Sequence, residues 1–318
     1  MREYILRRML LVVPIMLGVA ALTFFSFQLI AGDVVDLKCG ITCPEDVRQA
    51  LREDLGLARP LYEQFGDWLW GVMRGDLGKS LATGVPVTTE LGRRLPITAE
   101  LLVLTMGLSL LFGIPAGVIS AVRPGSIIDS VVRVVNVLWL SVPSFYLAIL
   151  VILFGFVWFG WSPPQFGAEG HVSFFDNPWV NLQQFLIPAV VLALGSAAII
   201  MRLVRSSMLE VLRQDYIRTA WSKGLRERAV VTRHAIKNAS IPVVTILGLE
   251  AGGLLGGAVI IESIFALNGV GKYLLESVLL RDIFVVQSVV LFFAATYVVI
   301  NLAVDVSYAW LDPRIRYS

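Results

Sequence analysis

The sequence predicts an all-α integral membrane protein with six transmembrane helices. The first observation is composition: 57% of the 318 residues are hydrophobic and only 16% are charged, whereas about a quarter of the residues in a soluble domain are charged. The second is a series of apolar runs, of which Met9–Ala31 has no charged residue and can cross about 30 Å of hydrocarbon. The third is the net charge of +2, which leaves no basic surface large enough for a nucleic-acid partner.

The six apolar runs divide the chain into an N-terminal span, an outer segment, a five-helix core and a short tail. Arg7 and Arg8 precede the first run, and a cleaved signal peptide is its alternative, although such a peptide would have a shorter apolar region that ends in small residues. The other predicted spans are 97–122, 134–159, 185–200, 241–265 and 284–310. The corresponding predicted segments are 1–31 (N-terminal span), 32–96 (extracytoplasmic cap), 97–310 (core, with a cytoplasmic loop at 205–240) and 311–318 (tail).

The distribution of basic residues predicts that both termini are cytoplasmic. The loop after the third predicted span has no Lys or Arg, and the loop after the fifth has only Lys272 and Arg281. The opposite side collects the arginines, as the positive-inside rule requires of cytoplasmic loops. They are Arg2, Arg7, Arg8, Arg123, Arg133, Arg202, Arg205, Arg213, Arg314 and Arg316.

The stretch "DYIRTAWSKGLRERAVVTRHAIKNASIP", residues Asp215–Pro242, combines six Lys or Arg with a His between two apolar runs. We expect a short helix, a break at Gly224, a second helix, and Pro242 at the mouth of the fifth span. Lys223 suits the last turn of the first helix, where a cation favours the dipole, and Gly224 suits the left-handed residue that follows. A docking element and a solvated loop on lipid headgroups both fit this pattern.

The outer segment is too charged to cross lipid, and we expect it to form a small helical cap. "PEDVRQALREDLGL" from Pro44 places Val47, Leu51 and Leu55 on one side of a predicted amphipathic helix. Cys39 and Cys43 lie in the same segment, where an oxidising compartment would permit a disulfide. A metal site is not expected there, because ligating neighbours are missing from the sequence.

The fifth predicted span carries small residues at helical spacing together with an acidic residue. Gly248, Gly252 and Gly256 follow at i, i+4 and i+8, a pattern that lets helices approach closely. Packing within the chain and packing against another subunit along a pathway are both open. Charge inside a membrane normally faces a cavity or a partner, so Glu250 has either a pathway or a structural role. For Glu100, Glu262 and Asp305, nearer the ends of their spans, we expect a structural role.

The basic stretch resembles the EAA loop of ABC-transporter permeases, the element that inserts into a groove on the ATPase subunit. The family spacing is E-A-A, three residues, G, and later I-x-L-P; this chain has Arg218-Thr219-Ala220, three residues, Gly224, and Ile241-Pro242. The departures are those of a subfamily, because "DYIRTA-x-x-KGL" and "RHA-x-x-N-A-x-IPVVT" resemble the first permease of the oligopeptide and dipeptide importers. Trp221 and Glu250 depart from that subfamily's pattern.

The resemblance covers nearly the whole chain, with several motifs in the family's order. They are "RRMLLVVPIMLGVAALTFFSFQLIAGD", "RGDLGKS", "RRLPITAELLVL", "IPAGVISAVRPGSIID", "LSVPSFYLAIL", "GLEAGGLLGGAVIIESIF" and "DVSYAWLDPRIR". It implies the type I ABC importer permease fold in a bacterial inner membrane, and half of a pathway for di- or oligopeptides. Relatives also carry glutathione, nickel chelates or oligosaccharides, and nothing in the sequence separates these substrates.

The resemblance also implies partners and site residues. The partners are a homologous second permease, two ATP-binding subunits that hold ATP and Mg, an extracytoplasmic substrate-binding protein and the lipid membrane. This chain itself is expected to have no catalytic residue, no bound cofactor and no metal; the sequence lacks G-x-x-x-x-G-K-[ST]. The implied ATPase-coupling residues are Asp215, Ile217, Arg218, Thr219, Ala220, Trp221, Lys223, Gly224 and Leu225. Of these, Ile217, Ala220, Trp221 and Leu225 are expected to form the buried contact with the ATPase. Lys223, together with Arg226 and Arg228, is expected to steer the association electrostatically.

Three other classes of membrane protein compete with this interpretation. An ion- or proton-coupled secondary carrier of small solutes would use similar acids, but it would show internal repeats and broken helices around a midplane site. An intramembrane protease would need a Gly-Asp pair within a span, a Ser motif or a His pair. A channel would need a filter-like loop.

Overall fold

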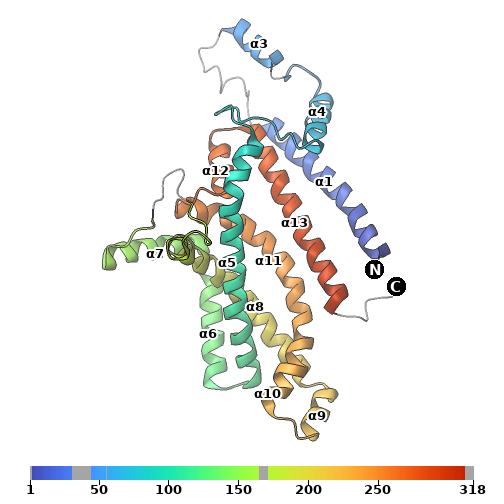
Figure 1. Ribbon diagram of the computed structural model, residues 1–318, viewed down its shortest axis with the longest axis vertical. Helices are drawn as coiled ribbons and strands as arrows, with labels where there is room; N and C mark the ends of the chain where they lie inside the picture. The colour runs from blue at the N-terminus through green and yellow to red at the C-terminus, as the bar shows by residue number, and fades with distance from the viewer. Residues whose placement is uncertain (1, 31–43, 55, 165–170, 312–318) are drawn as a thin grey trace. The chain divides into compact units, whose positions relative to one another are not determined.

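A computed structural model of the chain describes residues 2–30, 44–54, 56–164 and 171–311 (Figure 1). Within these ranges the regular structure is helical, apart from an isolated β-bridge between Lys79 and Pro86. The predicted all-α class is therefore confirmed. The helices are α1 (Arg2–Ile30), α3 (Glu45–Asp54), α4 (Leu61–Met73), α5 (Val87–Val122), α6 (Ile127–Ser141), α7 (Ser144–Phe159), α8 (Pro178–Leu212), α9 (Asp215–Ser222), α10 (Glu227–Ala229), the π-helix η1 (Val230–Ala235), α11 (Ile236–Ile264), α12 (Val270–Leu279) and α13 (Ile283–Leu311).

Among the described residues, five helices are long and apolar enough to cross a membrane, with α6 and α7 as a bent sixth candidate. The five candidate spans are Arg8–Ser26, Val87–Val122, Pro178–Leu212, Pro242–Ile264 and Ile283–Ser307. Two helices extend well beyond their predicted apolar runs: α5 begins ten residues before residue 97, and α8 ends twelve residues after residue 200. Hydropathy locates the hydrocarbon-facing part of a helix and not its capped ends, which lie in water.

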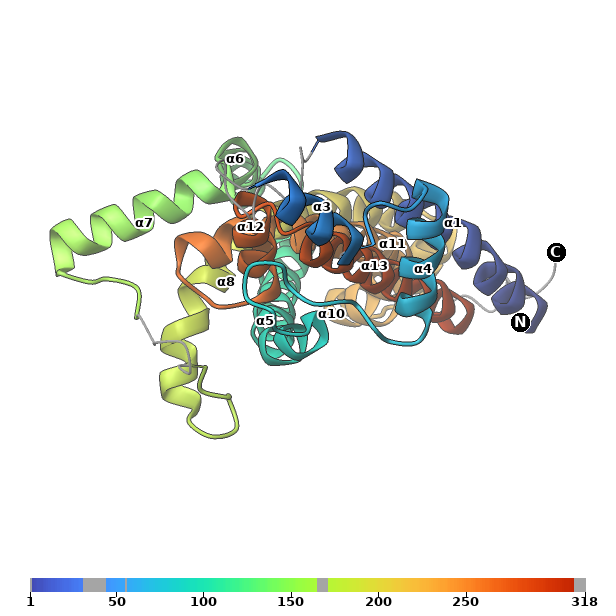
Figure 2. The same cartoon turned by 90° about the horizontal axis from the view of Figure 1, so that it is seen from above.

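The third predicted span, 134–159, is divided between two helices that pass the length and hydropathy criteria for a span only together. Its two halves, α6 and α7, meet at an angle of 95°, and both views show α7 leaving α6 sideways (Figures 1 and 2). Val142 adopts an extended conformation with φ −101° and ψ 117°, because the ring of a following proline disfavours the helical conformation. Pro143 then stands at the start of α7 as its N-cap.

Residues 97–267 and 300–311 belong to one compact unit, in which α8 contributes more buried side chains than any other described helix. Helix α5 lies against α8 with almost no space between the backbones. A Cβ atom on Gly117 would lie 2.7 Å from the carbonyl oxygen of Met201, and a Cβ atom on Gly113 would lie 2.9 Å from that of Ala197. A hydrogen bond from Ser109 Oγ to Ala193 O, 3.2 Å long, continues the same contact. The α5–α8 contact is therefore a close small-residue interface of the kind found in membranes.

A buried ion pair connects the ends of α5, α6 and α8. Asp129, 1% exposed, accepts hydrogen bonds from Arg205 Nε at 2.9 Å and Nη2 at 3.0 Å. The same carboxylate accepts the hydroxyl of Ser120 and the backbone N–H of Gly125. Ser126 caps α6 through the backbone N–H of Asp129. With four donors on a single carboxylate, the cost of burying its charge is offset.

Residues 2–96 and 268–299 belong to a second compact unit, which holds the cap segment. The predicted amphipathic helix after Pro44 is confirmed as α3. Asp282, 2% exposed, caps α13 and accepts the hydroxyl of Ser80 at 2.6 Å and the backbone N–H of Ala82 at 3.2 Å. Ser288 donates to the carbonyl oxygen of Leu77. The sequence analysis did not anticipate this attachment of the 77–82 segment, nor the short helix α12.

Burial changes the acidity of a tyrosine in this second unit. Tyr273 on α12 is 7% exposed, and burial, followed by the nearby carboxylates of Asp282 and Glu90, raises its pKa to about 12. The side chain of Arg94 lies 4.6 Å from the centre of its ring. The phenol is therefore neutral in the folded protein throughout the physiological range.

The predicted disulfide between Cys39 and Cys43 lies outside the described residues, and so does the tail from residue 312. Both stay predictions.

Replacing Gly117 by alanine is expected to destabilise the α5–α8 contact by about 1–3 kcal/mol, because the new methyl group would collide with backbone. Gly107→Ala on the same helix is the matched control, since nothing lies within 4 Å of a Cβ atom there. Thermal unfolding of the detergent-solubilised chain measures both; equal midpoints would contradict the close contact.

Replacing Asp129 by alanine is expected to cost about 3–5 kcal/mol, because it leaves the Arg205 guanidinium without its carboxylate. Arg133→Ala is the control: this arginine lies 3.6 Å from Asp129 but its side chain is 56% exposed, so its loss should cost less than about 1 kcal/mol. The double variant Asp129→Leu/Arg205→Met should recover most of the stability in denaturant titrations. A double variant no more stable than Asp129→Ala would refute this account.

Candidate functional site

Helix α9 is formed by the first part of the basic stretch and ends as the sequence predicts. Gly224 has φ +76°, which is the left-handed conformation expected of it. Its N–H donates to Trp221 O at 2.9 Å, and the N–H of Leu225 donates to Ala220 O at 3.4 Å. These two bonds are the pair that defines the Schellman motif. Glycine at position 224 therefore sets the direction in which the chain leaves α9.

One face of α9 is buried against its own chain. Ile217 is 0% exposed and Ala220 is 6% exposed. Both belong to an apolar cluster of buried residues that also includes Met208 at the end of α8 and Val230 in η1. The expectation that Ile217 and Ala220 supply contact with another protein is therefore wrong for this conformation. They hold α9 on α8 and η1, because burying an isoleucine side chain stabilises a contact by about 1.5–3 kcal/mol.

Large apolar side chains beside the buried face of α9, and in the turn that follows it, are partly exposed next to cations. Tyr216, Trp221 and Leu225 are 43%, 45% and 39% exposed. Arg218 reaches Asp215 at 3.5 Å in a fully surface-exposed pair, which contributes little to stability. Thr219 Oγ1 donates to the carbonyl oxygen of Asp215 and so turns back onto its own helix. Lys223, Arg226, Arg228 and Arg233 add exposed positive charge around the apolar group.

The predicted second helix and the fifth span are one continuous helical segment. The three residues of α10 run directly into η1, and η1 into α11, at whose interior Pro242 lies. Pro242 lies at the start of the candidate span Pro242–Ile264, as expected, but the helix continues through it without a break. The six-residue π-helix η1 inserts a wider turn between α9 and α11, a feature that is frequent at functional sites. Figure 1 shows α9 and α10 beside the C-terminal end of α8 and the N-terminal end of α11.

A polar contact that the sequence did not suggest joins α9 directly to α11. Asn238 Nδ2 donates to Tyr216 Oη at 2.9 Å and to the carbonyl oxygen of His234 at 3.0 Å. The two side chains are 22 residues apart, so no local pattern pairs them. A displacement of α9 would therefore reach α8 through the apolar cluster and α11 through this hydrogen bond.

The structure divides the predicted glycine stripe of α11. Gly248 is enclosed within the chain, because a Cβ atom there would lie 2.9 Å from Asn301 Oδ1 on α13. Gly256 has nothing within 4 Å of such an atom, and the same is true of Gly253. Gly252 is half-buried. With exposed Leu249 and Ile260, Gly253 and Gly256 form a face of α11 that nothing in the described chain covers.

The acids of the membrane helices differ in their partners. Thr98 Oγ1 donates to the fully buried Glu262 at 2.6 Å. Glu100 contacts His171 Nε2 at 2.9 Å and accepts from Asn181. Both acids have partners within the chain, as a structural role requires, and Asp305 also has an interaction within the chain. Glu250 is half-buried beside the uncovered face of α11, and no interaction within the described residues involves it.

Comparisons of sequence place the whole chain among transport proteins. The family described as "Binding-protein-dependent transport system inner membrane component" matches residues 113–317, and its N-terminal counterpart matches residues 1–102. A "putative peptide transport system permease protein" of Brucella abortus (strain 2308) is 41% identical over 318 residues, all of both chains. The dipeptide transport system permease protein DppB of Escherichia coli (strain K12) and the glutathione transport system permease protein GsiC of Pectobacterium atrosepticum are each 38% identical, also over all of both chains.

A comparison of folds agrees with this assignment. The MetNI methionine ABC transporter, solved in inward-facing conformations, contains a chain that matches with a TM-score of 0.57 at 20% identity, covering 70% of this chain and 96% of that one. The match shows the fold alone, which is that of an ABC importer permease. A secondary carrier fits these findings less well. The chain belongs to the family of binding-protein-dependent transport system inner membrane components, and it is a multi-pass ABC-importer permease of the group that contains the peptide permeases.

Proposed function

We propose that this chain forms half of the pathway of an ATP-driven peptide importer. We further propose that the 215–235 segment contacts the ATPase subunit and transmits its ATP-driven movement to the membrane helices. The observation that carries the proposal is that α9 is buried on one face and exposes aromatic side chains beside that face. The face with Ile217 is fixed inside the chain, while Tyr216 and Trp221 on either side of that face remain partly exposed among cations. Exposed aromatic side chains beside charge are typical of the central residues of protein interfaces.

ATP would be bound by separate subunits. A groove on such a subunit would enclose Trp221 and Leu225, and the surrounding cations would steer its acidic residues during association. Closure of two ATP-bound subunits would then move the two α9 helices together. Because α9 is attached to α8 and α11 by the apolar cluster and by Asn238, that movement would tilt the spans and open the pathway on the opposite side.

A homologous second permease would complete the pathway, because one set of spans leaves the face of α11 with Gly253 and Gly256 uncovered. Small residues permit a second helix to approach this face closely. The cap formed by α3 and α4 would receive an extracytoplasmic substrate-binding protein. This arrangement requires both termini on the cytoplasmic side, which the distribution of arginines in the sequence supports.

The proposed substrates are di- or oligopeptides, a class supported by the names of the relatives. Glu250 would face the pathway from the edge of the uncovered face of α11. A carboxylate inside a membrane is expensive and normally faces water or a partner, and the described residues offer it no partner. There it would attract the positively charged amino group that every free peptide carries.

Replacing Gly224 by valine is expected to reduce recovery of the ATPase about tenfold when the chain is pulled down from its native membrane. A β-branched residue at φ +76° is strained, so the backbone at position 224 would change conformation and the chain would leave α9 in a different direction. Nothing lies within 4 Å of a Cβ atom at this position, so the effect comes from the backbone alone.

Gly224→Asn is the matched control, because asparagine tolerates the left-handed conformation; it should recover the ATPase like the wild type. Recovery of a second permease should be equal in all three proteins. If Gly224→Val retains the ATPase, the 215–235 segment is an ordinary basic loop and the proposed coupling is refuted.

Replacing Glu250 by glutamine is expected to leave assembly intact and to reduce transport of a labelled dipeptide in proteoliposomes about tenfold, since the amide keeps the shape but loses the charge. Glu210→Gln, at an exposed position of α8, controls for the loss of an acid. Unchanged transport by Glu250→Gln would exclude Glu250 from the pathway, whereas lost assembly would assign it to the subunit contact.

A further inference from the structure

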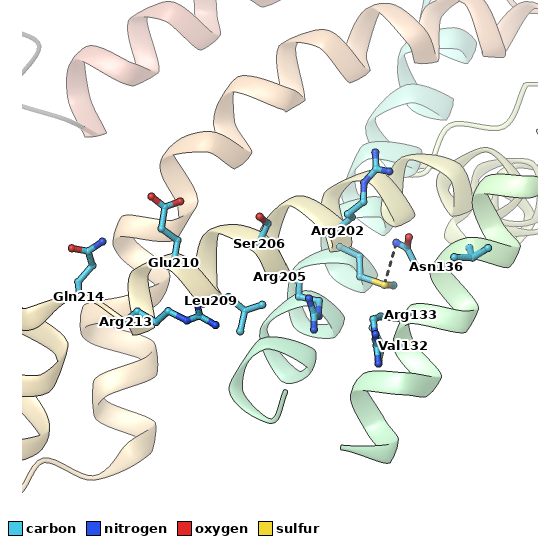
Figure 3. A pocket seen from close by; sticks show the side chains of 12 residues that line it. Val132, Arg133, Asn136, Arg202, Arg205, Ser206, Leu209, Glu210, Arg213 and Gln214 are labelled. Carbon is cyan, nitrogen blue, oxygen red and sulfur yellow. Dashed lines mark hydrogen bonds between the residues drawn. The ribbon is translucent and has the colours of Figure 1, made fainter. Parts of the chain in front are cut away.

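The proposed coupling of ATP hydrolysis to transport gives no role to an arginine-lined groove between α6 and α8. The groove has a volume of about 770 Å³, and Arg133, Arg202, Arg205 and Arg213 contribute to its walls. Figure 3 shows the side chains of Arg133 and Arg205 in the space between the two helices; Arg202, which leaves α8 in another direction in this view, also lines the groove. Residues 202, 206, 209 and 213 follow one face of α8 at helical spacing.

Two of the four arginines have no carboxylate within the described residues. Arg205 is held by Asp129 at 2.9 Å, and Arg133 approaches the same carboxylate at 3.6 Å. Arg202 and Arg213 take part in no ion pair of the described chain, and both are exposed. Glu210 is the acid that lines the groove. Positive charge therefore exceeds negative charge in this groove, and the groove favours an anion.

The groove lies at the height where the apolar part of the unit ends. Two hydrogen bonds hold α6 against α8: Asn136 Nδ2 donates to Ala198 O, and Arg205 Nε donates to the carboxylate of Asp129. Arg133 on α6 therefore lies at the level of Arg202 on α8. Arg202 follows the apolar run that ends at Met201. Arginines at this height meet the phosphate groups of a bilayer.

Apolar side chains continue the groove along α6. Val137 lines it together with Leu209 of α8, and Val134, Val137 and Leu138 are 60%, 61% and 58% exposed. A cationic end beside an exposed apolar wall matches the two parts of a phospholipid: a phosphate, which arginine binds through two parallel hydrogen bonds, and an acyl chain. Free phosphate would contact the cationic end of the groove alone and leave the apolar wall unoccupied.

We propose that this groove binds an anionic phospholipid, with Arg202 on its headgroup, Arg213 attracting the anionic headgroup from further along the groove, and the α6 wall along an acyl chain. The leaflet is the cytoplasmic one if the proposed orientation is correct. The binding itself depends neither on the peptide substrate nor on the ATPase. Basic pockets between membrane helices are known to select anionic headgroups in this way.

The test is native mass spectrometry of the full chain in neutral detergent, titrated with dioleoyl phosphatidylglycerol, dioleoyl phosphatidylcholine or inorganic phosphate. The wild type should retain phosphatidylglycerol in preference to phosphatidylcholine. Arg202→Gln/Arg213→Gln should weaken phosphatidylglycerol binding about 30-fold, or five- to sixfold for each arginine near the surface. Arg123→Gln/Lys237→Gln removes the same charge at exposed positions that do not line the groove, and it should bind like the wild type.

Four results would overturn the proposal. They are equal binding of the two lipids, full binding by the groove variant, competition by inorganic phosphate at the concentrations where the lipid binds, and loss of the bound lipid when a second permease assembles on the chain. The last would assign the groove to a subunit contact. Because the two substituted arginines, Arg202 and Arg213, are exposed, the variant should unfold at the wild-type temperature in the absence of lipid. That measurement separates lost binding from lost folding.

Discussion

The ion pair of Asp129 with Arg205 is the constraint on which the end of the molecule that carries α9 depends. A carboxylate that is 1% exposed is tolerated only when its charge is compensated, and here α8 provides the guanidinium, α5 a hydroxyl and the α5–α6 turn a backbone N–H. Each donor comes from a different element. The carboxylate therefore fixes three helix ends relative to one another, including the end of α8 from which α9 continues.

A fixed base gives α9 its proposed mechanical role. The apolar cluster around Ile217 attaches α9 to α8 and η1, and the Asn238–Tyr216 hydrogen bond attaches it to α11. The π-helix η1 lies between these attachments. A force on the exposed face of α9 would thus be divided between two spans, one of which is held by the close α5–α8 packing at Gly113 and Gly117. Helices that pack this closely move together, because the contact cannot deform gradually.

Acidic residues of the same type have different surroundings in this fold, and the difference separates structure from proposed function. Glu262 and Glu100 have hydrogen-bond partners within the chain, and Asp282 holds the 77–82 segment to the start of α13. Glu250 lies on the border between the buried and the uncovered faces of α11 without such a partner in the described residues. A group whose charge the chain does not satisfy is the one available to a substrate or to a second subunit.

The sequence by itself determined the membrane class, the places of the apolar spans and the end of α9 at Gly224, because hydropathy and the conformational freedom of glycine act over a few neighbouring residues. It could not determine that Ile217 and Ala220 face inward, or that Glu262 meets Thr98, because those facts depend on segments far apart in the chain. The proline at 143 was visible in the sequence, but the 95° turn into α7 was not. Only tertiary packing decided which arginine would satisfy Asp129, since Arg205 lies 76 residues away and a buried charge selects whichever donor the fold brings to it.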